Sequence, residues 1–105
     1  MKIFKQLSEK KYTHFTCNTI EELDELPITS VDIITEFAHI CEWLRVVHGI
    51  WVNADLNQFS KPDDLQWFYS IIFLKTCIYT NAKEHYNTPQ EAYSAAFDYI
   101  LKELI

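Results

Sequence analysis

The C-terminal stretch 87–105, NTPQEAYSAAFDYILKELI, constrains the fold more than any other part of the chain. Thr88 is a suitable N-cap because its hydroxyl can accept a hydrogen bond from a backbone N–H of the first helical turn. Glu91 stands three residues later, where it can complete a capping box, and Pro89 occupies the first helical position. These signals predict a helix over 89–104, with one apolar face formed by Tyr93, Phe97, Ile100 and Leu104.

A second amphipathic helix is predicted over 30–48. Either Thr29 or Ser30 can cap its start. Gly49 is the chain's single glycine, and it follows the helix directly, where a left-handed residue often ends one. Between these ends, apolar residues recur at intervals of four and three, at Ile33, Phe37, Ile40, Leu44 and Val47, with Ile34 and Cys41 widening the stripe.

Three strands are predicted between the two helices. Segment 50–56 alternates between apolar and polar positions, which is typical of a half-buried strand. Segment 65–74 is apolar on both sides, as in a central strand that is covered on both faces. A third strand is predicted over 77–80. The predicted fold class is therefore α+β, a small antiparallel sheet of about three strands packed with two main helices, 30–48 and 89–104.

The start of the chain is less well defined. Segment 1–11 fits either a helical turn or an edge strand, and the alternation of segment 12–17 favours a short strand. Thr19 and Glu22 can form a capping box for a short helix that must end before Pro27, with a loop as the alternative. The sequence therefore predicts no single arrangement for this part of the chain.

Length and composition narrow the organisation and the partners. A chain of 105 residues suits a single domain over 1–105, with 1–26 as a poorly defined N-terminal segment and 27–105 as an α-β-β-β-α core. A net charge of −6 disfavours contact with phosphates, so we expect no direct nucleic-acid binding. No apolar run is long enough to span a membrane, and no signal peptide is evident. Three cysteines without a C-x-x-C pair fit reduced thiols, so we expect a cytoplasmic protein.

Three stretches together resemble a family of small uncharacterised proteins. They are WLRVVHGIWV at 43–52, WFYSIIF at 67–73 and YNTPQEAYSAAFDYILKELI at 86–105. The family is carried by Bacteroides-type genomes, often in phage-derived or mobile regions, and shares a W-[LF]-R helix end, an aromatic hairpin and a C-terminal T-x-x-E-A helix. The resemblance covers 27–105. It implies the same architecture and a mobile-element context, and it transfers no catalytic residue because the family has no established activity.

The chain carries no spacing that is typical of catalysis or metal binding. His39 and Cys41 stand two apart on a helix and so point in different directions. Cys41 and Cys77 lie in apolar runs, where a raised thiol pKa and a packing role are expected. Asp63 and Asp64 would suit half of a divalent-metal or acid/base site, but turn formation before a strand is the favoured interpretation. We therefore expect no enzyme, no cofactor and no metal.

The aromatic residues carry the functional prediction. They make up 15% of the chain, and some are not expected to fit inside a core of this size. Trp51, Tyr69, Arg45 and Asn53 form the candidate interaction patch, with ordinary packing under a neighbouring element as the alternative. The predicted function is a non-enzymatic phage- or mobile-element-type accessory protein that acts through contact with a protein partner or through self-association as a homo-oligomer. The alternatives are a small-molecule or nucleotide-binding, sponge-like protein and, third, a metal-dependent enzyme.

Overall fold

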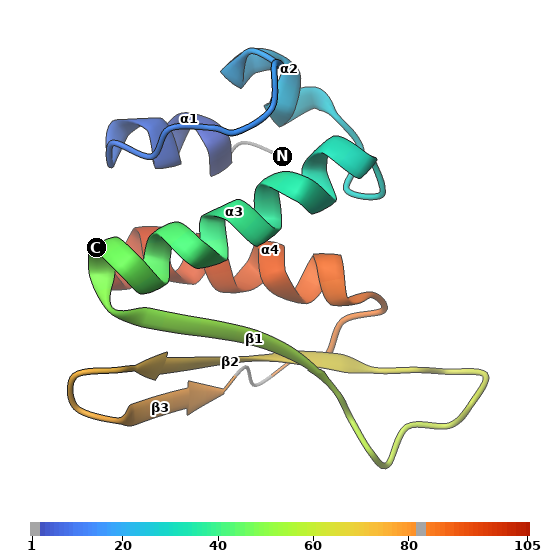
Figure 1. Cartoon of the computed structure of the whole chain (residues 1–105). Coiled ribbons are helices and arrows are strands. Elements are labelled where there is room, and N and C mark those ends of the chain that lie inside the picture. Colours follow the sequence, from blue (N-terminus) through green and yellow to red (C-terminus); the bar gives the residue numbers. More distant parts are fainter. Residues whose placement is uncertain (1–2, 82–83) are drawn as a thin grey trace.

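Two long helices lie on one face of an antiparallel sheet in the computed structural model, which describes residues 3–81 and 84–105 (Figure 1). The sheet is three-stranded, in the order β1-β2-β3. The predicted α+β class is therefore confirmed. In chain order the elements are α1 (Ile3–Glu9), α2 (Ile20–Glu25), α3 (Val31–His48), β1 (Ile50–Leu56), β2 (Trp67–Phe73), β3 (Ile78–Asn81), α4 (Pro89–Tyr99) and a final π-helical turn, η1 (Ile100–Leu104).

A single residue turns α3 into β1. Gly49 has φ 65° and lies in the left-handed region, and its N–H donates to the carbonyl of Leu44, as expected of a glycine that ends a helix. Because this one residue reverses the chain, β1 starts at Ile50 and packs against α3. The predicted helix end and the predicted limits of the first strand are both confirmed.

The strand register sorts the sheet residues onto two faces. Ile50, Val52 and Ile71 face the helices and are buried, since Ile50 pairs with Phe73 and Val52 with Ile71. The opposite face carries Trp51 and Tyr79, which are 45% and 58% exposed. No helix among the described residues covers that face (Figure 1). The prediction that β2 is covered on both faces was therefore wrong, because both long helices lie on one side.

The last helix starts with the predicted N-cap and Pro89, but the described residues lack the hydrogen bond from Thr88 N–H to the Glu91 side chain that would complete the predicted capping box. The N–H of Glu91 donates to the Thr88 hydroxyl at 3.2 Å, and Pro89 occupies the first turn. Ala92, Ala96 and Phe97 are buried, and α4 packs against β1, β2 and α3. After Tyr99 the chain widens into η1, so the predicted 89–104 helix consists of an α-helix and a π-helical turn.

The start of the chain forms two short helices above α3 (Figure 1). The capping box of Thr19 and Glu22 is present at the start of α2, as predicted. The strand predicted over 12–17 is absent from the described structure. The backbone N–H groups of Phe15 and Thr16 donate instead to the carboxylate of Glu36 on α3, at 2.8 and 2.6 Å. The Glu36 side chain accepts the hydrogen bonds that the backbone of a neighbouring strand would otherwise accept.

Candidate functional site

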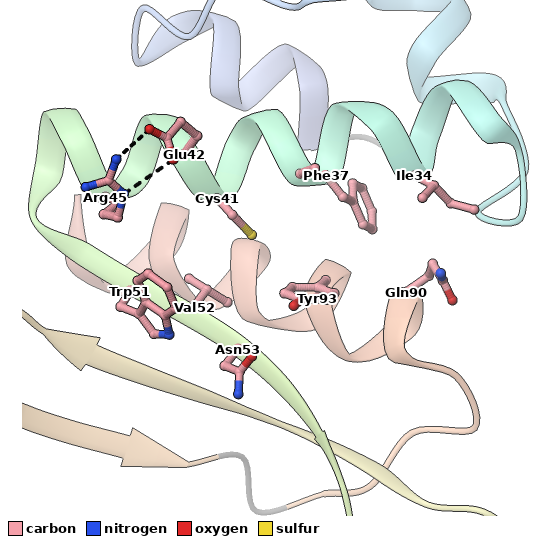
Figure 2. Close-up of a pocket in the computed structure, with 11 residues that line it drawn as sticks. Ile34, Phe37, Cys41, Glu42, Arg45, Trp51, Val52, Asn53, Gln90 and Tyr93 are labelled. Atoms are coloured by element: carbon pink, nitrogen blue, oxygen red, sulfur yellow. Dashed lines mark hydrogen bonds and ion pairs between the residues drawn. The ribbon is translucent and has the colours of Figure 1, made fainter.

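A groove of about 410 Å³ lies between α3 and β1 and is backed by α4 (Figure 2). It forms because α3 and β1 diverge from their junction at Gly49. Most of its lining is apolar or aromatic, and its polar groups lie toward the C-terminal end of α3 and at two positions on β1 and α4. The lining comprises Ile34, Phe37, Ala38, Cys41, Glu42 and Arg45 from α3, Trp51, Val52 and Asn53 from β1, and Gln90 and Tyr93 from α4.

The candidate interaction patch is divided by the fold. Arg45, Trp51 and Asn53 line the groove. Tyr69 does not: it pairs with Ala54 in the sheet register and therefore lies on the helix-facing side of β2. There it lines a second cavity that extends toward β3. Three of the four patch residues therefore come together, and the fourth belongs to another part of the surface.

The charged end of the groove is an ion pair within one helix. The Arg45 guanidinium donates to the Glu42 carboxylate, with Nη2–Oε1 at 2.5 Å and Nε–Oε2 at 3.3 Å (Figure 2). The hydrogen bond from Arg45 lowers the pKa of Glu42, and the same bond raises the pKa of Arg45. Both side chains are exposed. The pair is therefore ionised and close to neutral as a unit, and Arg45 is already engaged.

The Cys41 thiol points into the groove from α3 (Figure 2). Burial raises its pKa to about 12, as expected for a cysteine in an apolar run. At neutral pH the sulfur is a protonated thiol, and the thiolate is the form that attacks electrophiles or binds metals. Cys41 therefore contributes apolar surface to the groove.

Tyr93 joins α4 to the strand on the other side of the groove. Its hydroxyl accepts a hydrogen bond from the backbone N–H of Ala54. Burial raises the pKa of Tyr93, and this hydrogen bond partly opposes the rise. The ring lies across the back of the groove, so α4 determines how deep the groove is.

The outer edge of β1 faces the groove. The Gly49 carbonyl accepts from Leu74 N–H at 2.9 Å, and Asn57 N–H donates to the Gln66 carbonyl at 2.7 Å. Because backbone groups alternate in direction along an antiparallel strand, the even-numbered residues of β1 direct theirs away from β2. Val52 is the even-numbered residue that lines the groove. In the described chain β1 has no strand on that side; of the groups directed there, the Ala54 N–H is taken by the Tyr93 hydroxyl, and Val52 is buried.

Several lining residues were not among the sequence-based candidates. Phe37 and Tyr93 were assigned to core-facing stripes, and Cys41 and Ile34 to the widened edge of one stripe. That extra width was the available signal, because a helix whose apolar arc exceeds its contact with the sheet has apolar surface left over. Nothing in the local sequence indicated that Gln90 would lie opposite them.

The adjacent carboxylates lie away from the groove. Asp63 and Asp64 are exposed in the connection between β1 and β2, where Asp64 N–H donates to the Lys61 carbonyl in a turn. In residues 3–81 and 84–105, no group of three or more His, Cys, Asp or Glu side chains is placed to hold a metal ion. The same part of the chain contains no helix that is long and apolar enough to cross a membrane.

The fold and the groove define a small α+β domain with helices on one face of a sheet and an edge strand beside an apolar groove. Comparison of the chain with protein-family models, with curated proteins and with solved structures finds no match in any of the three. The chemistry of the groove therefore rests on its own residues.

Proposed function

We propose that this protein has no enzymatic activity and acts by binding an extended segment of a partner protein in the groove between α3 and β1. The observation that carries the proposal is that, among the described residues, β1 is an edge strand beside an apolar groove. An extended peptide can add to such an edge through main-chain hydrogen bonds, while a pocket beside it accepts alternate side chains. The partner would pair with the backbone of Val52, which is buried in the free protein, and Phe37, Cys41 and Tyr93 supply the apolar pocket.

The electrostatics favour an apolar anchor in the partner segment. Glu42 and Arg45 neutralise each other at the end of the groove, so the groove selects little for charge. The net charge of −6 argues against nucleic acid as the partner. The resemblance to Bacteroides-type proteins supports a phage or mobile-element setting for the partner, and reduced thiols support a cytoplasmic one.

The test is selection of peptides from a random library on the immobilised protein. Ala38→Trp fills the groove from an exposed position on α3, and Val46→Trp is the matched control on the same helix outside the groove. We expect selected peptides to bind at least about tenfold more weakly to Ala38→Trp and equally well to Val46→Trp. Peptides that bind both variants equally would show that the groove is not the site.

Hydrogen exchange tests strand addition itself. Binding of a peptide strand to β1 should slow exchange of the Val52 amide, because that N–H gains a main-chain acceptor. Unchanged exchange at Val52 with a bound peptide would mean that the peptide uses the groove without pairing to the strand.

A second candidate function is the binding of a small molecule, including a nucleotide, in the same groove. Its support is the volume of about 410 Å³ and the aromatic residues Phe37, Trp51 and Tyr93 in the lining. The engagement of Arg45 by Glu42 argues against phosphate groups as ligands. Native mass spectrometry distinguishes small-molecule binding from self-association. A retained ligand adds a small mass to the chain, whereas self-association gives multiples of the chain mass. A nucleotide panel that leaves the melting temperature unchanged would exclude nucleotide binding.

A further inference from the structure

A second cavity, of about 380 Å³, lies on the helix-facing side of the sheet toward β3. It exists because α4 packs mainly on β1 and β2, which leaves the surface over β3 uncovered. Three tyrosines dominate its lining, and we call it the tyrosine pocket. Its described lining residues are Tyr69, Thr80, Asn81, Glu84, Tyr86 and Tyr99.

The tyrosines of the tyrosine pocket come from three separate elements. Tyr69 belongs to β2, and Tyr99 is the last residue of α4, 36% exposed. Tyr86 precedes α4 and is held against β2 by two backbone hydrogen bonds with Trp67, both 2.7 Å. This bridge places the Tyr86 ring beside Tyr69, with ring centroids 6.4 Å apart and planes at 28°. The pocket is thus fixed by backbone pairing on one side and by a helix end on the other.

Negatively charged side chains lie near the Tyr69 hydroxyl. Burial raises the pKa of Tyr69. The neighbouring Tyr86 and Tyr99 add to the rise only when they are themselves ionised, whereas the carboxylates of Glu84 and Asp98 carry negative charge at neutral pH. Asp98 is paired with Lys102 at 3.1 Å, outside the lining. Within the described lining, Glu84 supplies the only charged side chain, and it is a carboxylate.

We propose that the tyrosine pocket binds an organic cation of the alkylammonium type. The electron-rich faces of aromatic rings attract such a cation, and its methyl or methylene groups can pack on the same rings. Glu84 would compensate its charge, and Thr80 and Asn81 offer polar contacts at the rim. The site is separate from the groove between α3 and β1, so either assignment can fail without the other.

The first test uses choline as the probe in a protein-observed NMR titration. Its control is the neutral analogue in which a carbon atom replaces the ammonium nitrogen. We expect saturable shifts at Tyr69, Tyr86 and Tyr99 with choline, and binding of the neutral analogue weakened by about fivefold or more. Absence of saturable choline binding, or equal binding of the neutral analogue, would overturn the proposal.

Single substitutions test the contributions of the aromatic faces and of the Glu84 charge to choline binding, and a control substitution tests for general effects on the fold. Tyr99→Ala should weaken choline binding about fivefold, whereas Tyr99→Phe keeps an aromatic face and should stay within about twofold. Glu84→Gln should also weaken binding, and more so at low salt, because it removes the compensating charge from an exposed position where folding is not at risk. Phe59→Ala, at an exposed aromatic residue outside the pocket, is the control. Equal losses for Phe59→Ala and Tyr99→Ala would contradict the assignment.

The cation can come from a free small molecule or from a side chain of another protein. A short peptide that contains trimethyllysine distinguishes the two sources. Tighter binding of the peptide than of choline supports a side chain as the natural ligand, and equal or weaker binding supports a free cation. If neither probe binds, the proposal is wrong.

Discussion

Glu36 is a fully buried carboxylate that joins the N-terminal segment to α3. Its side chain is 0% exposed and accepts hydrogen bonds from the backbone N–H groups of Phe15 and Thr16 and from the hydroxyl of Tyr12. Burial by itself would raise the pKa of Glu36, but these hydrogen bonds outweigh burial and the pKa is lowered. The carboxylate is therefore ionised and hydrogen-bonded, and it replaces a strand partner for this loop.

Glu36→Gln should lower the free energy of unfolding by about 2 kcal/mol, because hydrogen bonds to a charged group are stronger than those to an amide. One of the donors would also face the amide NH₂ instead of an oxygen. Chemical denaturation measures the loss, with the exposed Glu103→Gln as a control that should change little. A loss no larger than that of the control would mean that these hydrogen bonds contribute nothing net.

The contribution of Glu36 depends on pH in a defined direction. Its pKa is lower in the folded chain than its ordinary value of 4.5, so the folded state binds this proton less readily than the unfolded state. The added stability is therefore fully present above that ordinary value and is lost as the pH falls through the folded pKa. The difference in unfolding free energy between the native chain and Glu36→Gln should shrink on acidification below about pH 4.5. A difference that stays constant with pH would contradict this assignment.

At the scale of elements, short local signals determine where helices begin and end. Gly49 ends α3 and starts β1, and the direction of both elements from this residue gives the groove its shape. A Cβ atom added at Gly49 would meet no described atom within 4 Å. The requirement for glycine is therefore one of backbone conformation, because φ 65° is unfavourable for residues with a Cβ.

Gly49→Ala should destabilise the domain by about 1 kcal/mol, and Gly49→Asn by less, since Asn tolerates the left-handed region. Thermal and chemical denaturation of the two variants check the order. If Gly49→Asn lowers the free energy of unfolding as much as Gly49→Ala or more, a steric clash and not the backbone conformation is responsible for the loss.

The two long helices differ in their N-caps, which allows the capping hydrogen bond to be tested by comparison. The Thr88 hydroxyl accepts a hydrogen bond from Glu91 N–H, whereas the Ser30 side chain makes no capping bond to any described residue. Thr88→Ala should therefore cost about 1 kcal/mol in the free energy of unfolding, and Ser30→Ala clearly less. Equal costs for the two substitutions would show that capping hydrogen bonds do not account for the preference.

At the scale of the molecule, one apolar cluster connects the N-terminal helices to the sheet. Phe4 and Leu7 of α1 and Leu23 of α2 are buried in the same cluster as Ile40 and Phe97. Polar contacts add to this connection, because the Asp24 carboxylate accepts from the N–H of Phe4 at 2.9 Å. The N-terminal helices therefore share the core of the sheet and its covering helices.

Leu7→Ala should lower the stability of the whole domain by about 3 kcal/mol, because it leaves a cavity in this shared cluster. Unfolding followed by tryptophan fluorescence and by far-ultraviolet circular dichroism should still give coincident transitions. Two separated transitions would mean that the N-terminal helices unfold independently of the rest.

The sequence by itself determined the features whose physics lies within a few residues. The caps at Thr88 and Thr19, the left-handed Gly49 and the alternation of 50–56 each act through local backbone geometry, and the structure contains all of them. The α+β class followed from their order along the chain.

Only the tertiary structure decided what lies beside what. It placed Arg45, Trp51 and Asn53 along one groove and Tyr69 in the tyrosine pocket, because α4 packs over β1 and β2 between them. It also brought the buried Glu36 to the loop that local alternation assigned to a strand. Packing of distant segments decides such neighbours, and the periodicity of a single segment carries no information about them.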